Sequence, residues 1–207
     1  MKQPIKYLLR LAACFLFVSP LTACAATVSS KALEGKVLEE GVNKPVTNAM
    51  VIVRWIGDIS SIGHGSSVCY HVEVVTTENH GQFHVPAWEK PSPYGDIAHP
   101  RAIRDAYAPH YTFARADKEV IYLQLFTGVR EERLAYLSRI TVSCSDRKEI
   151  EINLLPLYKA LYEEAKGLAI TKDDKLKVLY RLRDVERLEL GTDKAWENFR
   201  QRERELK

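Results

Sequence analysis

The sequence predicts a mainly β protein with C-terminal helices: an antiparallel β-sandwich followed by a helical segment. Apolar residues alternate along residues 49–55 and again along 68–74, which is the period expected for strands with one buried face. Residues 77–81 (T-E-N-H-G) contain residue types that tolerate positive φ and predict a tight turn. After Pro156 the apolar spacing becomes that of amphipathic helices. These observations predict two packed layers with a helical appendage.

The first residues have the pattern of an export signal. Lys2, Lys6 and Arg10 precede an apolar run, residues 11–18, that is too short to span a bilayer. Residues 21–24 (L-T-A-C) resemble the bacterial lipoprotein box. The resemblance implies that Cys24 is the lipid attachment residue and the first residue of the mature protein.

The expected organisation is a signal peptide over residues 1–23, a tether over 24–30, a sandwich over 31–155 and a helical extension over 156–207. By resemblance to Gram-negative lipoproteins, an alanine after the modified cysteine favours sorting to the outer membrane. The expected location is therefore the periplasm, with the lipid held in the outer membrane. The alternative is ordinary cleavage near Ala25 or Ala26, which would leave a soluble periplasmic protein.

The charge balance excludes an electrostatic role in nucleic-acid binding. The chain has 30 basic and 27 acidic residues, and loss of residues 1–23 removes three basic residues and no acidic ones. The mature chain then has 27 of each sign, so its formal charge falls from +3 to zero. We expect contact with the membrane through the lipid and no nucleic-acid partner.

Two cysteines remain for a disulfide in the exported part. Cys14 lies in the signal and Cys24 in the lipoprotein box, which leaves Cys69 and Cys144. A bond between these two would close a long loop and stabilise the fold by about 4 kcal/mol. Strict alternation places Cys69 with His71, opposite the valine and tyrosine face, so the bond requires a strand end or a bend. Two free thiols are the alternative.

Several short segments resemble the carboxypeptidase regulatory-like domain. They are 35–37 (G-K-V), 44–46 (K-P-V), 49–53 (A-M-V-I-V), 76–77 (T-T) and 81–86 (G-Q-F-H-V-P). Members of this family have a transthyretin-like (prealbumin-like) β-sandwich. The resemblance implies a non-catalytic module, because the active site of the carboxypeptidases lies in another domain.

The rest of the sandwich region is read from proline content and apolar pattern. Residues 90–109 contain several prolines and predict a surface loop between the sheets. Residues 119–126 are apolar on both sides and predict a central strand. Residues 139–144 and 148–154 predict two further strands that close the sandwich.

The C-terminal region predicts three helices. Leu157, Leu161, Ala165 and Leu168 lie on one face of the first. Residues 171–174 (T-K-D-D) form a capping start for the second, whose apolar residues recur every three positions and so drift around the helix. This helix should contact more than one neighbour. Gly191 should end it, and Trp196 and Phe199 share a face of the third helix.

No catalytic or metal-binding motif stands out. The chain has six histidines without the spacing of a zinc site: His64, His71, His80, His84, His99 and His110. Residues 63–67 (G-H-G-S-S) have the wrong order for a nucleophile elbow and predict a flexible loop. We therefore expect no catalytic residues, no metal and no cofactor.

The sequence supports three hypotheses about function. The first is a non-enzymatic periplasmic lipoprotein that acts as a binding or structural module of the cell envelope, with an envelope protein or a glycan as partner. The second is a small metal-dependent enzyme that uses histidines near residues 90–111. The third is a carbohydrate- or peptide-binding module with Trp88, Tyr94 and Tyr107 as ligand-contact residues.

Overall fold

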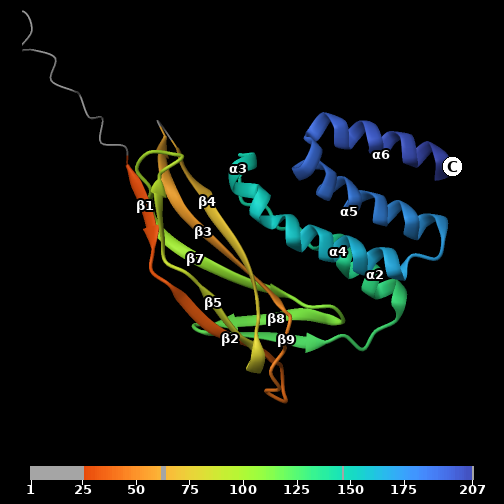
Figure 1. The fold of residues 1–207 in the computed structure, drawn as a ribbon, viewed down its shortest axis with the longest axis horizontal. Coiled ribbons are helices and arrows are strands. Elements are labelled where there is room, and N and C mark those ends of the chain that lie inside the picture. The colour runs from red at the N-terminus through yellow and green to blue at the C-terminus, as the bar shows by residue number, and fades with distance from the viewer. Residues whose placement is uncertain (1–25, 62–63, 146, 207) are drawn as a thin grey trace, which may run out of the picture.

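The computed structural model of the chain describes residues 26–61, 64–145 and 147–206, and it places strands first and helices after them (Figure 1). This order confirms the expected mainly β region with C-terminal helices. The strands are β1 (Thr27–Ser30), β2 (Leu33–Glu39), β3 (Met50–Ser61), β4 (His64–Thr76), β5 (Gln82–Val85), β6 (Trp88–Pro91), β7 (Ala98–Tyr107), β8 (Tyr111–Asp117) and β9 (Val120–Leu125). The helices are η1 (Asn79–Gly81), α2 (Arg130–Arg139), α3 (Lys148–Glu151), η2 (Ile152–Leu154), α4 (Leu155–Leu168), α5 (Lys172–Leu190) and α6 (Thr192–Leu206).

The strands form three sheets, with the orders β5-β2-β9-β8, β4-β3-β7 and β1-β6. All pairings are antiparallel except that of β2 with β9, which is parallel and brings Val37 beside Ile121. The four-stranded sheet is therefore mixed, which differs from the antiparallel expectation. β9 lies inside this sheet, as its continuous apolar run predicts.

The sheet β4-β3-β7 separates two apolar cores. Val51, Val53 and Trp55 of β3 join residues of β2, β5 and β9 in one core. Ile52, on the opposite face of β3, joins residues of the helices in the other. Figure 1 shows the helices on one side of the sheets. Successive apolar side chains of β3 are thus buried in different cores, one on each face of the sheet.

A β-bulge in β4 changes which residues share a face. Trp55 pairs with His71 and Ile56 pairs with Cys69, so Tyr70 is an extra residue in β4. Tyr70 lies in the core between the sheets, whereas Val72 lies in the core under the helices. The prediction that these residues share one face is therefore wrong, because the bulge shifts the alternation by one residue.

The predicted loop over residues 90–109 is largely strand. β7 pairs with β3 and forms an edge of its sheet, where the missing N–H of Pro100 disrupts no central ladder. The pairing is irregular between Ile56 and Asp58, opposite this part of β7, and His99 has a φ of 48°. Proline is compatible with this strand because it lies at an irregular edge.

The two predicted closing strands are also wrong. Residues 139–144 are the end of α2 and a coil in which Val142 and Cys144 are buried, so their alternation reflects an extended segment on the core without a strand partner. Residues 148–154 are helical: Ile150 and Leu154 are both buried and lie one helical turn apart. The C-terminal helices therefore begin at Arg130 and not after Pro156.

The predicted helix signals are confirmed. Leu157, Leu161 and Ala165 are buried on α4. The hydroxyl of Thr171 accepts a hydrogen bond from the N–H of Asp174, whose carboxylate accepts one from the N–H of Thr171, and this capping box starts α5. α5 packs against α2, α4 and α6, as its drifting apolar stripe predicts.

The turn after β4 depends on one buried hydroxyl. Thr77 is buried, donates to the carbonyl of Val46 and accepts from the N–H of Ala49, both at 2.9 Å. Gly81 has a φ of 68°, and a Cβ on it would lie 2.4 Å from the carbonyl oxygen of Val37. The predicted turn is confirmed, and glycine is required at its end.

The expected signal peptide, Cys24 and Ala25 lie outside the described residues. Among the residues that the structure describes, no helix is long and apolar enough to cross a membrane.

Candidate functional site

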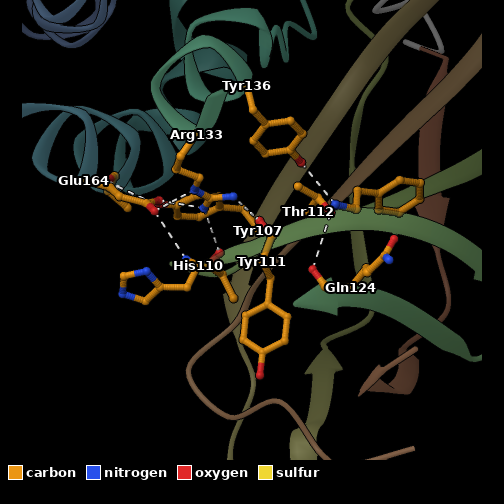
Figure 2. A network of polar contacts seen from close by, with 11 residues as sticks. Tyr107, His110, Tyr111, Thr112, Gln124, Arg133, Tyr136 and Glu164 are labelled. Carbon is orange, nitrogen blue, oxygen red and sulfur yellow. Dashed lines mark hydrogen bonds and ion pairs between the residues drawn. The ribbon is translucent and has the colours of Figure 1, made fainter. Parts of the chain in front are cut away.

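An ion pair with little exposure to solvent joins α2 to α4 beside the end of β7 (Figure 2). The guanidinium of Arg133 on α2 donates from Nε and Nη2 to the two carboxylate oxygens of Glu164 on α4, at 2.8 and 2.9 Å. The side chains are 4% and 9% exposed. Such a two-point contact fixes the orientation of both groups.

The turn between β7 and β8 supplies the remaining partners of this pair. The hydroxyl of Tyr107 donates to Glu164 at 2.5 Å, and the N–H of His110 donates to it at 3.3 Å. Arg133 also donates to the carbonyls of Ala108 and Tyr111. Both charged groups thus have hydrogen-bond partners in the helices and in the segment that links β7 to β8. We call Arg133, Glu164 and their partners in residues 107–111 the joint.

The joint shifts the pKa values of its acidic groups. Burial alone would raise the pKa of Glu164, but the hydrogen bonds from Arg133 and Tyr107 outweigh burial and lower it. Burial raises the pKa of Tyr107 strongly, and the adjacent Glu164 carboxylate raises it further. Glu164 is therefore held as a carboxylate and Tyr107 as a neutral donor.

The predicted disulfide is confirmed between Cys69 and Cys144, whose Cα atoms lie 4.8 Å apart. The bulge at Tyr70 supplies the required bend, because it places Cys69 on the same side of β4 as Val72, toward the helices. The bond ties β4 to the coil that precedes α3.

A second polar cluster lies where side chains of β6 contact side chains of β4. Nζ of Lys90 lies 2.6 Å from Nδ1 of His71, and Nε2 of His71 lies 3.0 Å from Oε1 of Glu73. The indole of Trp88 packs on the imidazole of His71, with ring centroids 4.1 Å apart. The ring centroid of Trp55 lies 5.1 Å from that of His71. We call Glu73, His71 and Lys90 the β6 relay. It is the candidate functional site.

The β6 relay borders a pocket. Lys90 lines an open cavity of about 330 Å³ together with Pro91, Ser92, Pro93, Arg147, Glu149 and Ile150. Arg147 is held over this cavity by a 2.8 Å hydrogen bond to the carbonyl of Pro93 and by contact with the ring of Tyr94 at 5.1 Å. A lysine and an arginine thus line one small cavity.

The three predicted ligand-contact aromatics occupy different environments. Tyr107 is 5% exposed and belongs to the joint. Trp88 packs among Trp55, His71 and Tyr70. The hydroxyl of Tyr94 shares a 2.8 Å hydrogen bond with Ser145. Trp88 and Tyr94 lie beside the β6 relay and its pocket, respectively, whereas Tyr107 lies in the joint.

The histidines have separate partners. His84 contacts Glu34 at 3.2 Å and His99 contacts Asp58 at 3.3 Å, both at exposed positions. His80 and His110 have φ values of 62° and 67° in turns. Within residues 26–61, 64–145 and 147–206, no group of three or more histidine, cysteine or acidic side chains could hold a metal ion.

The sequence did not indicate Arg133, Glu164 or Lys90. The pattern His71-x-Glu73 places two titratable groups on one face of a strand, and this was the available signal for the β6 relay. The contribution of Lys90 depends on the tertiary contact between β6 and β4, which spacing in the sequence does not show.

No family model matches the chain, and no curated protein matches it. A 9R-lipoxygenase from Cyanothece PCC8801 is similar among solved structures, with 13% sequence identity and a TM-score of 0.24. The match covers 72% of this chain and 26% of the lipoxygenase chain. A similarity at this level carries no argument about fold or function.

Proposed function

We propose that the chain is a periplasmic lipoprotein, anchored to the outer membrane through Cys24, that serves as a non-enzymatic binding module of the cell envelope on a transthyretin-like sandwich. The Cys69–Cys144 bond carries this proposal, because disulfides persist in oxidising compartments such as the periplasm. The L-T-A-C box at residues 21–24 supports the anchor.

The helices offer a surface for an envelope protein. Arg183 on α5 lies 5.2 Å from the ring of Tyr180 and 4.5 Å from that of Trp196, and these rings belong to residues that are 45% and 39% exposed. Exposed tryptophan, tyrosine and arginine side chains dominate the energetics of many protein interfaces. The joint supports this role, because it holds the helices firmly on the sheets.

Cell fractionation tests the anchor. The wild type should sediment with the outer membrane, Cys24→Ser should leave the membrane fraction, and Ala25→Asp should move to the inner membrane. Cys14→Ser serves as a matched control, since it removes a cysteine that lies outside both the lipoprotein box and the disulfide. Retention of Cys24→Ser in the membrane fraction would contradict the proposal.

Photo-crosslinking in intact cells tests the binding surface. A photoreactive residue in place of Tyr180 should give a discrete crosslinked product that Trp196→Ala weakens. The same residue in place of Lys118, which is exposed in the turn between β8 and β9, should not give that product. Equal products from both positions would argue against the helical surface.

A further inference from the structure

The contacts within the β6 relay define its hydrogen-bond directions. A lysine ammonium has no acceptor, so Nδ1 of His71 accepts from Nζ of Lys90 across 2.6 Å. The proton of the neutral imidazole is then on Nε2, which faces Glu73 at 3.0 Å. The second contact is close but is not aligned as a hydrogen bond in this conformation. Such contacts often tighten only when a ligand is bound.

The surroundings of Lys90 disfavour its charged form. Burial lowers the pKa of Lys90, and the negative charge of Glu73 acts in the opposite direction more weakly. His71 is 7% exposed and packs against Trp88, which restricts the imidazole to this orientation. An amine in contact with an oriented base has the arrangement of an activated nucleophile.

The geometry points to Lys90 as an amine that binds small carbonyl compounds reversibly as imines, with Nδ1 of His71 as the proton acceptor and Glu73 as the group that orients the imidazole. The site is separate from the helical surface around Trp196, and it does not depend on the anchor at Cys24. Small carbonyl compounds are thus a second class of ligand, beside the envelope protein that the chain is proposed to bind.

The binding step is balanced without a further reactant. The neutral amine of Lys90 forms a bond to the carbonyl carbon, and His71 takes one proton from that nitrogen. His71 passes that proton to the former carbonyl oxygen, which gives a carbinolamine. His71 then moves the second proton of the nitrogen to the hydroxyl group, the carbon–oxygen bond breaks, and water leaves. The remaining C=N bond is the imine, and addition of water reverses the sequence. No oxidation or reduction takes place.

The pocket selects the carbonyl compound. A volume of about 330 Å³ lies at the low end of the range for small-molecule pockets, which favours a small ligand. Arg147 lines it with donors that remain beyond its bond to Pro93, so a carboxylate beside the carbonyl group would gain an ionic contact. Glu149 also lines the pocket and opposes a second negative charge. We therefore assign the ligand class as small aldehydes or ketones with one carboxylate.

Reductive trapping on the purified wild-type protein tests the assignment. Glyoxylate with cyanoborohydride converts an imine to carboxymethyl-lysine, and peptide mass spectrometry measures its rate of formation at each lysine. Lys90 should react at least about tenfold faster than exposed Lys44 and Lys118, because a positioned base contributes that much or more. Reaction at Lys90 at or below the rate of those lysines would overturn the proposal.

Variants test whether the reactivity of Lys90 depends on His71 and Glu73 or only on the exposure of Lys90 to solvent. His71→Asn keeps an acceptor near the position of Nδ1 but removes the base, and Glu73→Gln removes the orienting charge. Both should reduce the rate at Lys90 toward that of the surface lysines while those lysines react as before. Unchanged rates in folded variants would contradict the roles assigned to His71 and Glu73. If either variant fails to fold, the wild-type comparison still decides the central assignment.

A neutral aldehyde tests the preference for a carboxylate. Arg147→Gln should slow the reaction of Lys90 with glyoxylate several-fold and leave its reaction with propionaldehyde unchanged. Equal effects on both aldehydes would contradict the ionic contact with Arg147.

Discussion

Glu164 holds Arg133 by two hydrogen bonds at 2.8 and 2.9 Å, and this pair connects α4 to α2 at the point where both meet the β7–β8 turn. The side chain of Arg133 is buried, and that of Glu164 has little exposure to solvent. It fixes the position of the helices on the sheets, on which the proposed binding surface depends.

Loss of one partner should destabilise the protein strongly. Glu164→Leu leaves the Arg133 charge buried without its counterion, and removal of one partner of a buried pair costs about 3–5 kcal/mol. Urea denaturation measures the difference. The double variant Arg133→Met/Glu164→Leu should recover part of the loss, because no unpaired charge remains. If the stability losses of the single variants simply add in the double variant, the proposed coupling of Arg133 and Glu164 is contradicted. Glu197→Gln, which breaks an exposed pair with Lys194, is a control that should change stability little.

The same pair predicts how stability depends on pH. The pKa of Glu164 is lower in the folded protein than its ordinary value of 4.5. A depressed pKa contributes stability above the unfolded value, and this contribution is lost as pH falls through the folded pKa. The wild type should therefore lose stability below about pH 4.5 more steeply than Glu164→Gln. Denaturation curves of both proteins from pH 7 downward measure this, and parallel losses would contradict it.

The disulfide should stabilise the fold through its long loop. Cys69 and Cys144 are separated by 75 positions, and a bond closing such a loop contributes about 4 kcal/mol in the chain-entropy model. The double variant Cys69→Ala/Cys144→Ala should lower the free energy of unfolding by that amount, as measured by urea denaturation. Addition of reductant should lower wild-type stability to the level of the variant and leave the variant unchanged. A reductant effect on the variant would point to another cause.

Gly35 should not accept a side chain. A Cβ on Gly35 would lie 2.3 Å from the carbonyl oxygen of Glu119 and 2.6 Å from the ring of Phe83. Gly35→Ala should cost about 1–3 kcal/mol by thermal or urea denaturation. Gly65→Ala is the matched control, since no atom lies within 4 Å of the corresponding Cβ and the change should be neutral or nearly so. Equal stability of the two variants would contradict the described packing of β2 against β5.

Local signals in the sequence predicted much of the fold. The alternation along β3, the turn at Gly81 and the capping box at Thr171 depend on neighbours in the chain, and each is found as predicted. The bulge at Tyr70 was not visible, because an extra residue in β4 is defined only by its pairing with β3. For the same reason the sequence predicted that the disulfide needs a strand end or a bend and did not show which of the two is present.

The errors arose where one pattern fits two structures. Val142 and Cys144 alternate because an extended coil covers the core, and alternation by itself does not require a strand partner. Ile150 and Leu154 are an even number of positions apart, so they would share one face of a strand. They are also four positions apart, so they share one face of a helix. The candidate site was missed because Lys90 meets His71 only through the packing of β6 across β4.

Mass spectrometry of the mature N-terminus tests the central claim most directly. Peptides from protein made with its own signal in a Gram-negative host should begin with Cys24 carrying a diacylglycerol and an acyl chain. An unmodified N-terminus at Ala25 or Ala26 would contradict the lipoprotein assignment and leave a protein free in the periplasm.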